Sequence, residues 1–94
     1  MASLGTLNSG NLISSSAAHS GGQGLLSITG TLAATGQPAS VILEDDHTGT
    51  FEPSGDAVLH TSPSKLNFSL PASVNVRARI TGADSSTAVE VHVS

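Results

Sequence analysis

From residue 25 onward the chain alternates apolar and polar residues in short runs, and turn-forming residues separate these runs. Alternation of this kind places successive side chains on opposite faces of a β-strand, and turns recurring roughly every ten residues are typical of a sandwich or small barrel. No run shows the sustained apolar period of a helix. We therefore expect an all-β fold, a small antiparallel β-sandwich, Ig-like or jelly-roll-like, of about seven short strands. The expected strands are 25–32, 39–45, 48–52, 56–61, 65–70, 73–80 and 87–93.

The same alternation divides each expected strand into an inner and an outer face. In several strands one of the two faces is apolar throughout, and these apolar faces are predicted to form the core between two sheets. The apolar faces comprise Leu26, Ile28 and Leu32; Leu66, Phe68 and Leu70; Val74, Val76, Ala78 and Ile80; and Val89, Val91 and Val93.

Residues 1–24 differ from the rest because they are rich in Ser, Gly, Asn and Ala and carry only isolated apolar residues. Such a segment is too polar to form a core by itself. We interpret it as an extended N-terminal arm attached to a sandwich domain, 25–94, and a disordered terminus is the alternative. The arm is expected to contact a partner through its apolar residues, which are Leu4, Leu7, Leu12 and Ile13.

The expected core has few large side chains, because the 94 residues include two Phe and no Trp, Tyr or Cys. A chain of this size buries only about two-thirds of its unfolded surface, and without disulfides its stability has to come from packing. Burial against a partner, or against further copies of the chain, would supply what is missing. We therefore expect a homo-oligomer or an assembly component.

Seven acidic and three basic residues give a formal net charge of −4. Binding of nucleic acids and of anionic membranes needs concentrated Lys and Arg, so we expect neither as a partner. No stretch approaches the ~20 apolar residues of a membrane-spanning helix, and no signal peptide is visible. We expect synthesis in a cytoplasm.

Two of the three cationic residues, Arg77 and Arg79, lie two positions apart in an apolar run. If 73–80 and 87–93 form an antiparallel hairpin, one of these arginines faces Glu90 across the strands, and the register decides which one. An exposed pair of this kind contributes at most about 1 kcal/mol, so it would fix the register more than it stabilises the fold. A salt bridge between subunits is the alternative role for these charges.

No arrangement of residues in the sequence points to catalysis, a metal or a cofactor. The densest polar run, 44–52, contains Asp45, Asp46 and His47, but it lacks the ligand spacing of a calcium loop and is interpreted as a charged turn. The four histidines are too scattered to predict a zinc site, and no serine lies in a Gly-x-Ser-x-Gly motif. We therefore expect no enzymatic activity, no metal and no cofactor.

The motifs SITGTL, SVILED, TGTF and KLNFSLPASVNVRARITGADSSTAVEVHV, in this order, resemble those of small β-sandwich proteins from the structural gene clusters of tailed bacteriophages. The similarity covers residues 24–93. Many members of this group carry an SxDGxxW segment after the second strand, whereas this chain has EDDH at 44–47 and no Trp. The residues that carry the match are Gly30, Thr31, 48–51, Phe68 and 76–82.

This resemblance implies a structural virion protein, a capsid decoration or cement protein that binds and stabilises the capsid surface through its arm and edge strands. The implied partners are the major capsid protein or other virion subunits, and a homotrimer is the preferred oligomer. The implied location is the capsid surface of a virion assembled in the host cytoplasm. The alternative is a phage tail-associated or adhesin-like recognition module that binds a receptor or glycan through loops, for which the candidates are 34–38, 53–55 and 81–86.

Overall fold

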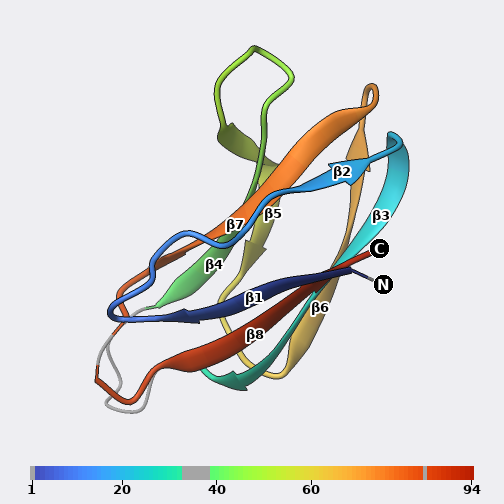
Figure 1. Ribbon diagram of the computed structural model, residues 1–94. Coiled ribbons are helices and arrows are strands. Elements are labelled where there is room, and N and C mark those ends of the chain that lie inside the picture. Colours follow the sequence, from blue (N-terminus) through green and yellow to red (C-terminus); the bar gives the residue numbers. More distant parts are fainter. Residues whose placement is uncertain (1, 33–38, 84) are drawn as a thin grey trace.

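The structure is a computed structural model, and it describes residues 2–32, 39–83 and 85–94 (Figure 1). Every regular element in this part of the chain is a β-strand, and the described residues include no helix that is long and apolar enough to cross a membrane. The expected all-β sandwich is therefore confirmed. The strands are β1 (Ala2–Asn8), β2 (Ala17–His19), β3 (Gly22–Thr31), β4 (Ser40–Asp45), β5 (Glu52–Leu59), β6 (Ser64–Leu70), β7 (Val74–Thr81) and β8 (Ala88–Val93).

The strands form two antiparallel sheets, sheet A in the order β1-β8-β3-β6 and sheet B in the order β2-β7-β4-β5. The first strand pairs with the last, the second with the seventh, the third with the sixth and the fourth with the fifth. This is a long eight-stranded hairpin rolled up so that successive pairs fall in alternate sheets, which is the jelly roll. An Ig-like sandwich would place the last two strands in one sheet, whereas β7 and β8 lie in different sheets.

The strand expected at 48–52 is not formed, because most of this run makes a turn between β4 and β5. The N–H of Gly49 donates a hydrogen bond of 2.9 Å to the carbonyl oxygen of Asp46. Asp at the first position of a β-turn and Gly at the fourth are the preferred residues there. The apolar alternation of this run is too short to override that preference.

The core lies between the two sheets and contains the predicted inner faces of β3, β6, β7 and β8. Of the residues predicted there, Leu66 and Val74 are partly buried and the others are buried. Strands β4 and β5 add Val41, Leu43 and Leu59 to this core. The period-two alternation of the sequence thus assigned these faces correctly.

An arm was expected at residues 1–24, but the described part of this range, 2–24, belongs to the sheets. It contains β1, β2 and the start of β3, and Leu4 and Leu7 of β1 are 1% and 0% exposed in the chain's own core. Residues three apart normally face opposite sides of a strand. Here a register shift between Ser3 and Gly5 bulges β1, and Gly5 adopts a φ of +98°, so both leucines face inward. The expected use of these two leucines against a partner does not fit this packing.

The segment 9–16 between β1 and β2 joins the two sheets along one side of the sandwich, as the blue chain beside β7 in Figure 1 shows. Its backbone pairs with β1 through two hydrogen bonds between Asn8 and Asn11 and one from the N–H of Ser15 to the oxygen of Leu4, each 3.1 Å. On its other edge it pairs with β7. We call this the closed side. On the opposite side, the open side, β5 and β6 are the edge strands of their sheets.

Candidate functional site: an apolar groove beside paired arginines

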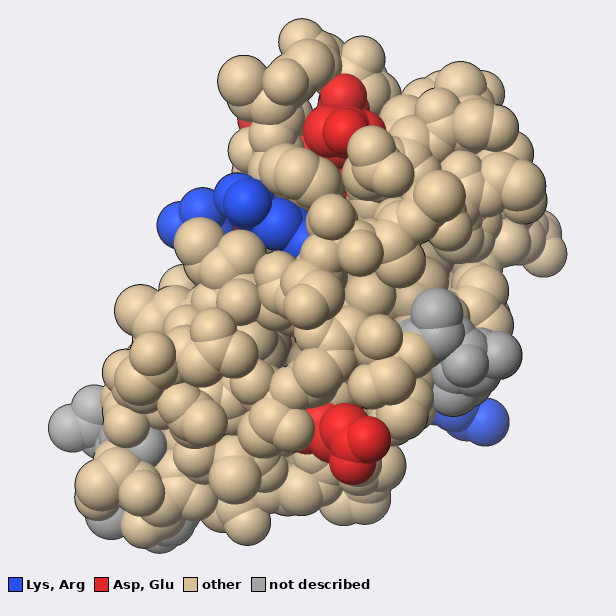
Figure 2. All heavy atoms as spheres, in the orientation of Figure 1, with Lys and Arg blue, Asp and Glu red and all other residues tan. Residues whose placement is uncertain are grey.

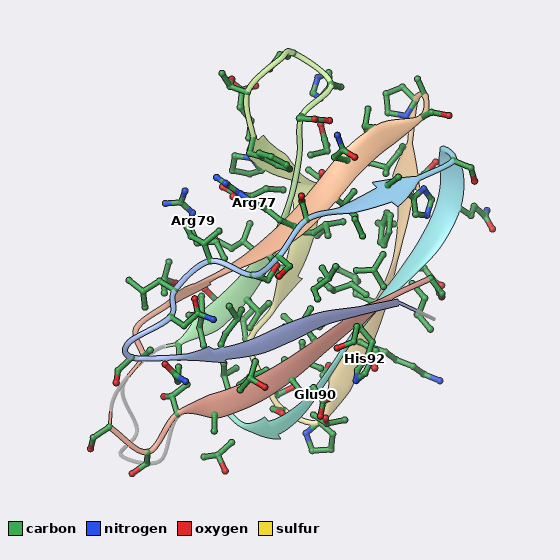
Figure 3. All side chains as sticks on the ribbon, in the orientation of Figure 1. Arg77, Arg79, Glu90 and His92 are labelled. Atoms are coloured by element: carbon green, nitrogen blue, oxygen red, sulfur yellow. The ribbon has the colours of Figure 1, made fainter. Side chains whose placement is uncertain are left out.

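The arginines Arg77 and Arg79 lie on β7 (Figure 3). Both pair with Glu44 of the neighbouring strand β4. The Nε of Arg77 is 2.9 Å from Oε1 of Glu44, and the Nε of Arg79 is 3.3 Å from Oε2 of the same carboxylate. The predicted partner, Glu90, is wrong. Strand β7 lies in sheet B and the next strand, β8, lies in sheet A, so these two strands form no hairpin.

Glu90 instead lies on β8 in sheet A, away from the arginines (Figure 3). Its side chain is more than half exposed, and its Oε1 is 3.3 Å from Nε2 of His92 on the same strand. Glu90 is therefore a separate surface charge, available to another molecule and not engaged with Arg77 or Arg79.

The carboxylate of Glu44 is buried, with 5% of its side chain exposed, and two cations share it. Arg77 is also stacked on Phe51, with its guanidinium carbon 4.2 Å from the ring centroid, so a cation–π contact adds to its ion pair. Arg79 has fewer stabilising contacts than Arg77. Its Nε is buried and donates no hydrogen bond, because it lies within ion-pair distance of Glu44 but is not aligned for a hydrogen bond. We call these four residues the arginine cluster.

Next to Arg79, the segment 9–16 displays two large apolar side chains. Leu12 is 49% exposed and Ile13 is 39% exposed, and no other large apolar residue in the described part of the chain reaches this level. Ile13 pairs with Arg79 through a backbone bridge. Together with Thr81 and Ala83 they line a groove of about 420 Å³, which we call the Ile13–Arg79 groove.

Backbone hydrogen bonds hold this apolar pair in place. The N–H of Ile80 donates to the oxygen of Leu12 at 2.9 Å, and the N–H of Ser14 donates to the oxygen of Ala78 at 2.8 Å. The hydroxyl of Ser14 accepts a further hydrogen bond of 2.8 Å from the N–H of Ala78. Leu12 and Ile13 are therefore presented from a fixed strand pair, and their exposure is part of the fold.

The structure thus separates the residues that the sequence grouped as an interface. Leu12, Ile13 and Arg79 meet at one groove, Arg77 lies beside it, Glu90 lies on the other sheet, and Leu4 and Leu7 are in the core. The roles of Glu44 and Phe51 were not expected from the sequence, where both residues lie in the run interpreted as a charged turn. The signal that points to Glu44 is its position at the end of the buried strand β4, where an acid needs a buried cationic partner.

A second polar cluster lies at the open side and is formed by Asp45, His47 and Ser54. The carboxylate of Asp45 is buried and accepts hydrogen bonds from the hydroxyl of Ser54 and from Nδ1 of His47, one on each oxygen. In a serine hydrolase the histidine lies between the serine and the acid and takes the proton of the serine. Here the acid lies in the middle, so this geometry leaves Ser54 without a base.

The hydrogen bonds of this cluster shift the pKa values of its members. Burial raises the pKa of Asp45, but the hydrogen bonds from Ser54 and His47 outweigh burial and hold it below the usual value. The hydrogen bond to Asp45 raises the pKa of His47. Hydrogen bonds from Asn75 lower the pKa of the neighbouring Asp46. The hydrogen bonds within the cluster therefore favour the ionised forms of Asp45 and His47, and they connect the two ends of the β4–β5 turn.

Among the described residues no group of three or more His, Cys, Asp or Glu side chains is placed to hold a metal ion. A second hollow, of about 520 Å³, lies between β5 and β6 on the open side, and its walls include Pro53, Ser54, Gly55 and Phe68. Comparison of the chain with protein-family models, with curated proteins and with solved structures finds no match.

Proposed function

We propose that this chain is a structural virion protein, a capsid decoration or cement protein that attaches through the Ile13–Arg79 groove. The observation that carries the proposal is the fixed display of Leu12 and Ile13 on the surface of a jelly roll. Exposed large apolar residues that gather beside a charge mark interaction sites more often than isolated ones do. A strand pair that holds them rigid reduces the entropy lost on binding.

Two further features support a role in assembly. The jelly roll is an architecture of viral capsid domains, although it also serves other functions. The sequence resembles structural proteins of tailed bacteriophages in its motif order, and these motifs extend from β3 to β8, with TGTF in the turn between β4 and β5. The implied partners are therefore the major capsid protein or other virion subunits, and the implied location is the capsid surface.

The packing of the N-terminal residues changes the proposed mode of attachment. Leu4 and Leu7 fill this chain's own core, so they supply burial that an oligomer was expected to provide. Attachment then depends on a preformed groove and not on an arm that crosses to a neighbour. A homotrimer stays the preferred oligomer in this proposal, and light scattering on the purified chain measures the number of copies.

The attachment experiment uses particles assembled without the chain and a double variant, Leu12→Ser with Ile13→Ser. Added wild-type chain should co-sediment with the particles, and the double variant should bind at least about tenfold more weakly, because it removes the apolar anchors. Leu25→Ser is the matched control, since Leu25 is half-buried beside the fully buried Leu26 on β3 of the other sheet. Equal attachment of the double variant and the control would exclude the groove as the attachment site.

A second candidate function is the recognition module, tail-associated or adhesin-like, that binds a receptor or glycan. The observation that favours it is that Pro53, Ser54 and Gly55, one of the candidate loop sequences, line the hollow at the open side. Reordering these three residues should then abolish binding to host cells while incorporation into particles persists. Loss of incorporation with intact cell binding would contradict this candidate.

A further inference from the structure

Arg79 is the least neutralised charge of the arginine cluster. Glu44 is the one carboxylate in the cluster, and its better-aligned hydrogen bond goes to Arg77. Arg79 keeps 43% of its side chain exposed and lines the groove, and the described residues that line this groove include no acidic side chain. Figure 2 shows the resulting blue patch where Figure 3 labels the two arginines, apart from the red acidic groups. A chain of net charge −4 therefore presents a local positive charge at its exposed apolar site.

The position of Ile13 adds an apolar contact to this charge. Ile13 and Arg79 are bridge partners on adjacent strands, so their side chains leave the same face within roughly 5 Å at Cβ. A ligand that packs against Ile13 in the groove therefore also lies next to the side chain of Arg79. The planar guanidinium suits a carboxylate, which can accept two parallel hydrogen bonds from it.

From this charge and apolar complementarity we infer that the Ile13–Arg79 groove takes an extended segment of a capsid subunit in which a carboxylate stands next to a large apolar side chain. This inference rests on the proposed function and names the chemistry of its partner. A nucleic-acid phosphate is a poor occupant, because the net charge of the chain opposes a polyanion. A second copy of this chain, offering the exposed Glu90, is the occupant against which the experiment discriminates.

The probe is a capped pentapeptide, Gly-Leu-Asp-Leu-Gly, titrated into the isotope-labelled full chain and followed by amide chemical shifts. The shifts should saturate and should concentrate at Ile13, Arg79 and Gly82. Replacing Asp of the peptide by Asn should weaken binding about tenfold, since a charge-assisted hydrogen bond is lost. A peptide with Ser in place of both Leu should also bind more weakly. Shifts at β5 and β6 instead, or none up to millimolar peptide, would overturn the inference.

Arg79→Gln should weaken binding of the peptide about tenfold, and Lys65→Gln should leave it unchanged. Both variants remove one positive charge, but Lys65 lies on β6 of the other sheet, so the pair separates a local contact from the overall charge. Retained amide dispersion in Arg79→Gln shows that the fold persists. Equal affinities of the two variants would refute a role for Arg79.

Two measurements separate this inference from the proposed function. If the chain attaches to particles and Arg79→Gln attaches equally well, the partner chemistry is wrong and the decoration function stands. If the peptide binds as expected but wild-type chain fails to attach to particles, the decoration function fails and the groove chemistry stands. Sedimentation that shows a dimer lost in both Arg79→Gln and Glu90→Gln would assign the groove to a second copy and overturn the inference.

Discussion

The closed and open sides of the sandwich are stabilised by different forces. On the closed side, backbone hydrogen bonds run from β1 through the segment 9–16 to β7, and the core beneath them contains Leu4 and Leu7. Residues 2–16 contain no Asp, Glu or His. On the open side, β5 and β6 are sheet edges, and the nearby contacts include the charged hydrogen bonds of Asp45. Residues 2–16 thus depend on burial and backbone pairing, whereas the open side depends in part on protonation.

This difference explains where an attachment groove is best placed. Segment 9–16 has backbone partners on both of its edges, so its exposed side chains stand on the more firmly held side of the molecule. Free edges such as β5 and β6 can pair with other chains, and natural proteins protect them with charges and proline. Lys65 on β6 and Pro53 on β5 are of this kind.

The largest effect is expected from deletion of residues 2–16, which removes the closed side entirely. The deletion exposes the edge of β8 and takes Leu4 and Leu7 out of the core, and each buried leucine is worth about 2–5 kcal/mol. Because small domains have only about 5–15 kcal/mol in total, the truncated chain should not unfold cooperatively. Thermal denaturation followed by circular dichroism measures this.

A synthetic peptide of residues 1–16, added in trans, is the control for this deletion and should restore part of the transition. A cooperative melt of the truncated chain near that of the full chain would contradict the expectation. Residues 25–94 would then be nearer to the independent domain that the sequence predicts.

A smaller effect comes from shortening one leucine on each side. Leu7→Ala should lower the free energy of unfolding by about 2–5 kcal/mol, because Leu7 is fully buried. Leu66→Ala on β6 should cost less than half as much, since Leu66 is only partly buried at the open side. Urea unfolding of both variants, with equal slopes, measures the difference. Equal losses would show that the two sides contribute alike.

The regular strands could be predicted from the sequence because their alternation is local. Val89, Val91 and Val93 face inward as expected, since nothing interrupts the period of two. Strand β1 could not be recognised, because the bulge at Gly5 brings Leu4 and Leu7 to one face at a spacing that alternation excludes. A glycine between two apolar residues was the one available signal.

The partner of the arginines could not be predicted for a different reason. The hairpin expectation assumed that consecutive strands pair, which holds for most but not all connections. In a jelly roll β7 pairs with β2 and β4, so the acid that meets Arg77 lies 33 positions earlier in the chain. Alternation fixes which face a residue occupies, but it leaves open which strand lies alongside. The groove depends on both the face and the neighbouring strand. The sequence could therefore propose Leu12, Ile13 and Arg79 as contact residues, but it could not predict that they lie together.

The smallest effect, and the one specific to the open side, is a dependence of stability on pH. The pKa of Asp45 is lower in the folded chain than its usual value, so its contribution is present above the unfolded pKa of about 3.9 and is lost as the pH falls through the folded value. The pKa of His47 is raised, so its contribution is complete below about 6.5 and is lost as the pH rises through the folded value. The free energy of unfolding should therefore decrease both in acid and above neutral pH.

His47→Asn tests this assignment, because it should remove the decline above about pH 6.5 and keep the decline in acid. His60→Asn is the matched control, since His60 is exposed and lies outside the cluster with Asp45. The midpoint of urea unfolding between pH 3 and pH 9 gives both limbs of the curve. A neutral-to-basic decline that persists in His47→Asn and vanishes in His60→Asn would place the titrating group elsewhere.

Leu7→Ala should shift the whole curve downward without changing its shape, because the closed side carries no titrating group between residues 2 and 16.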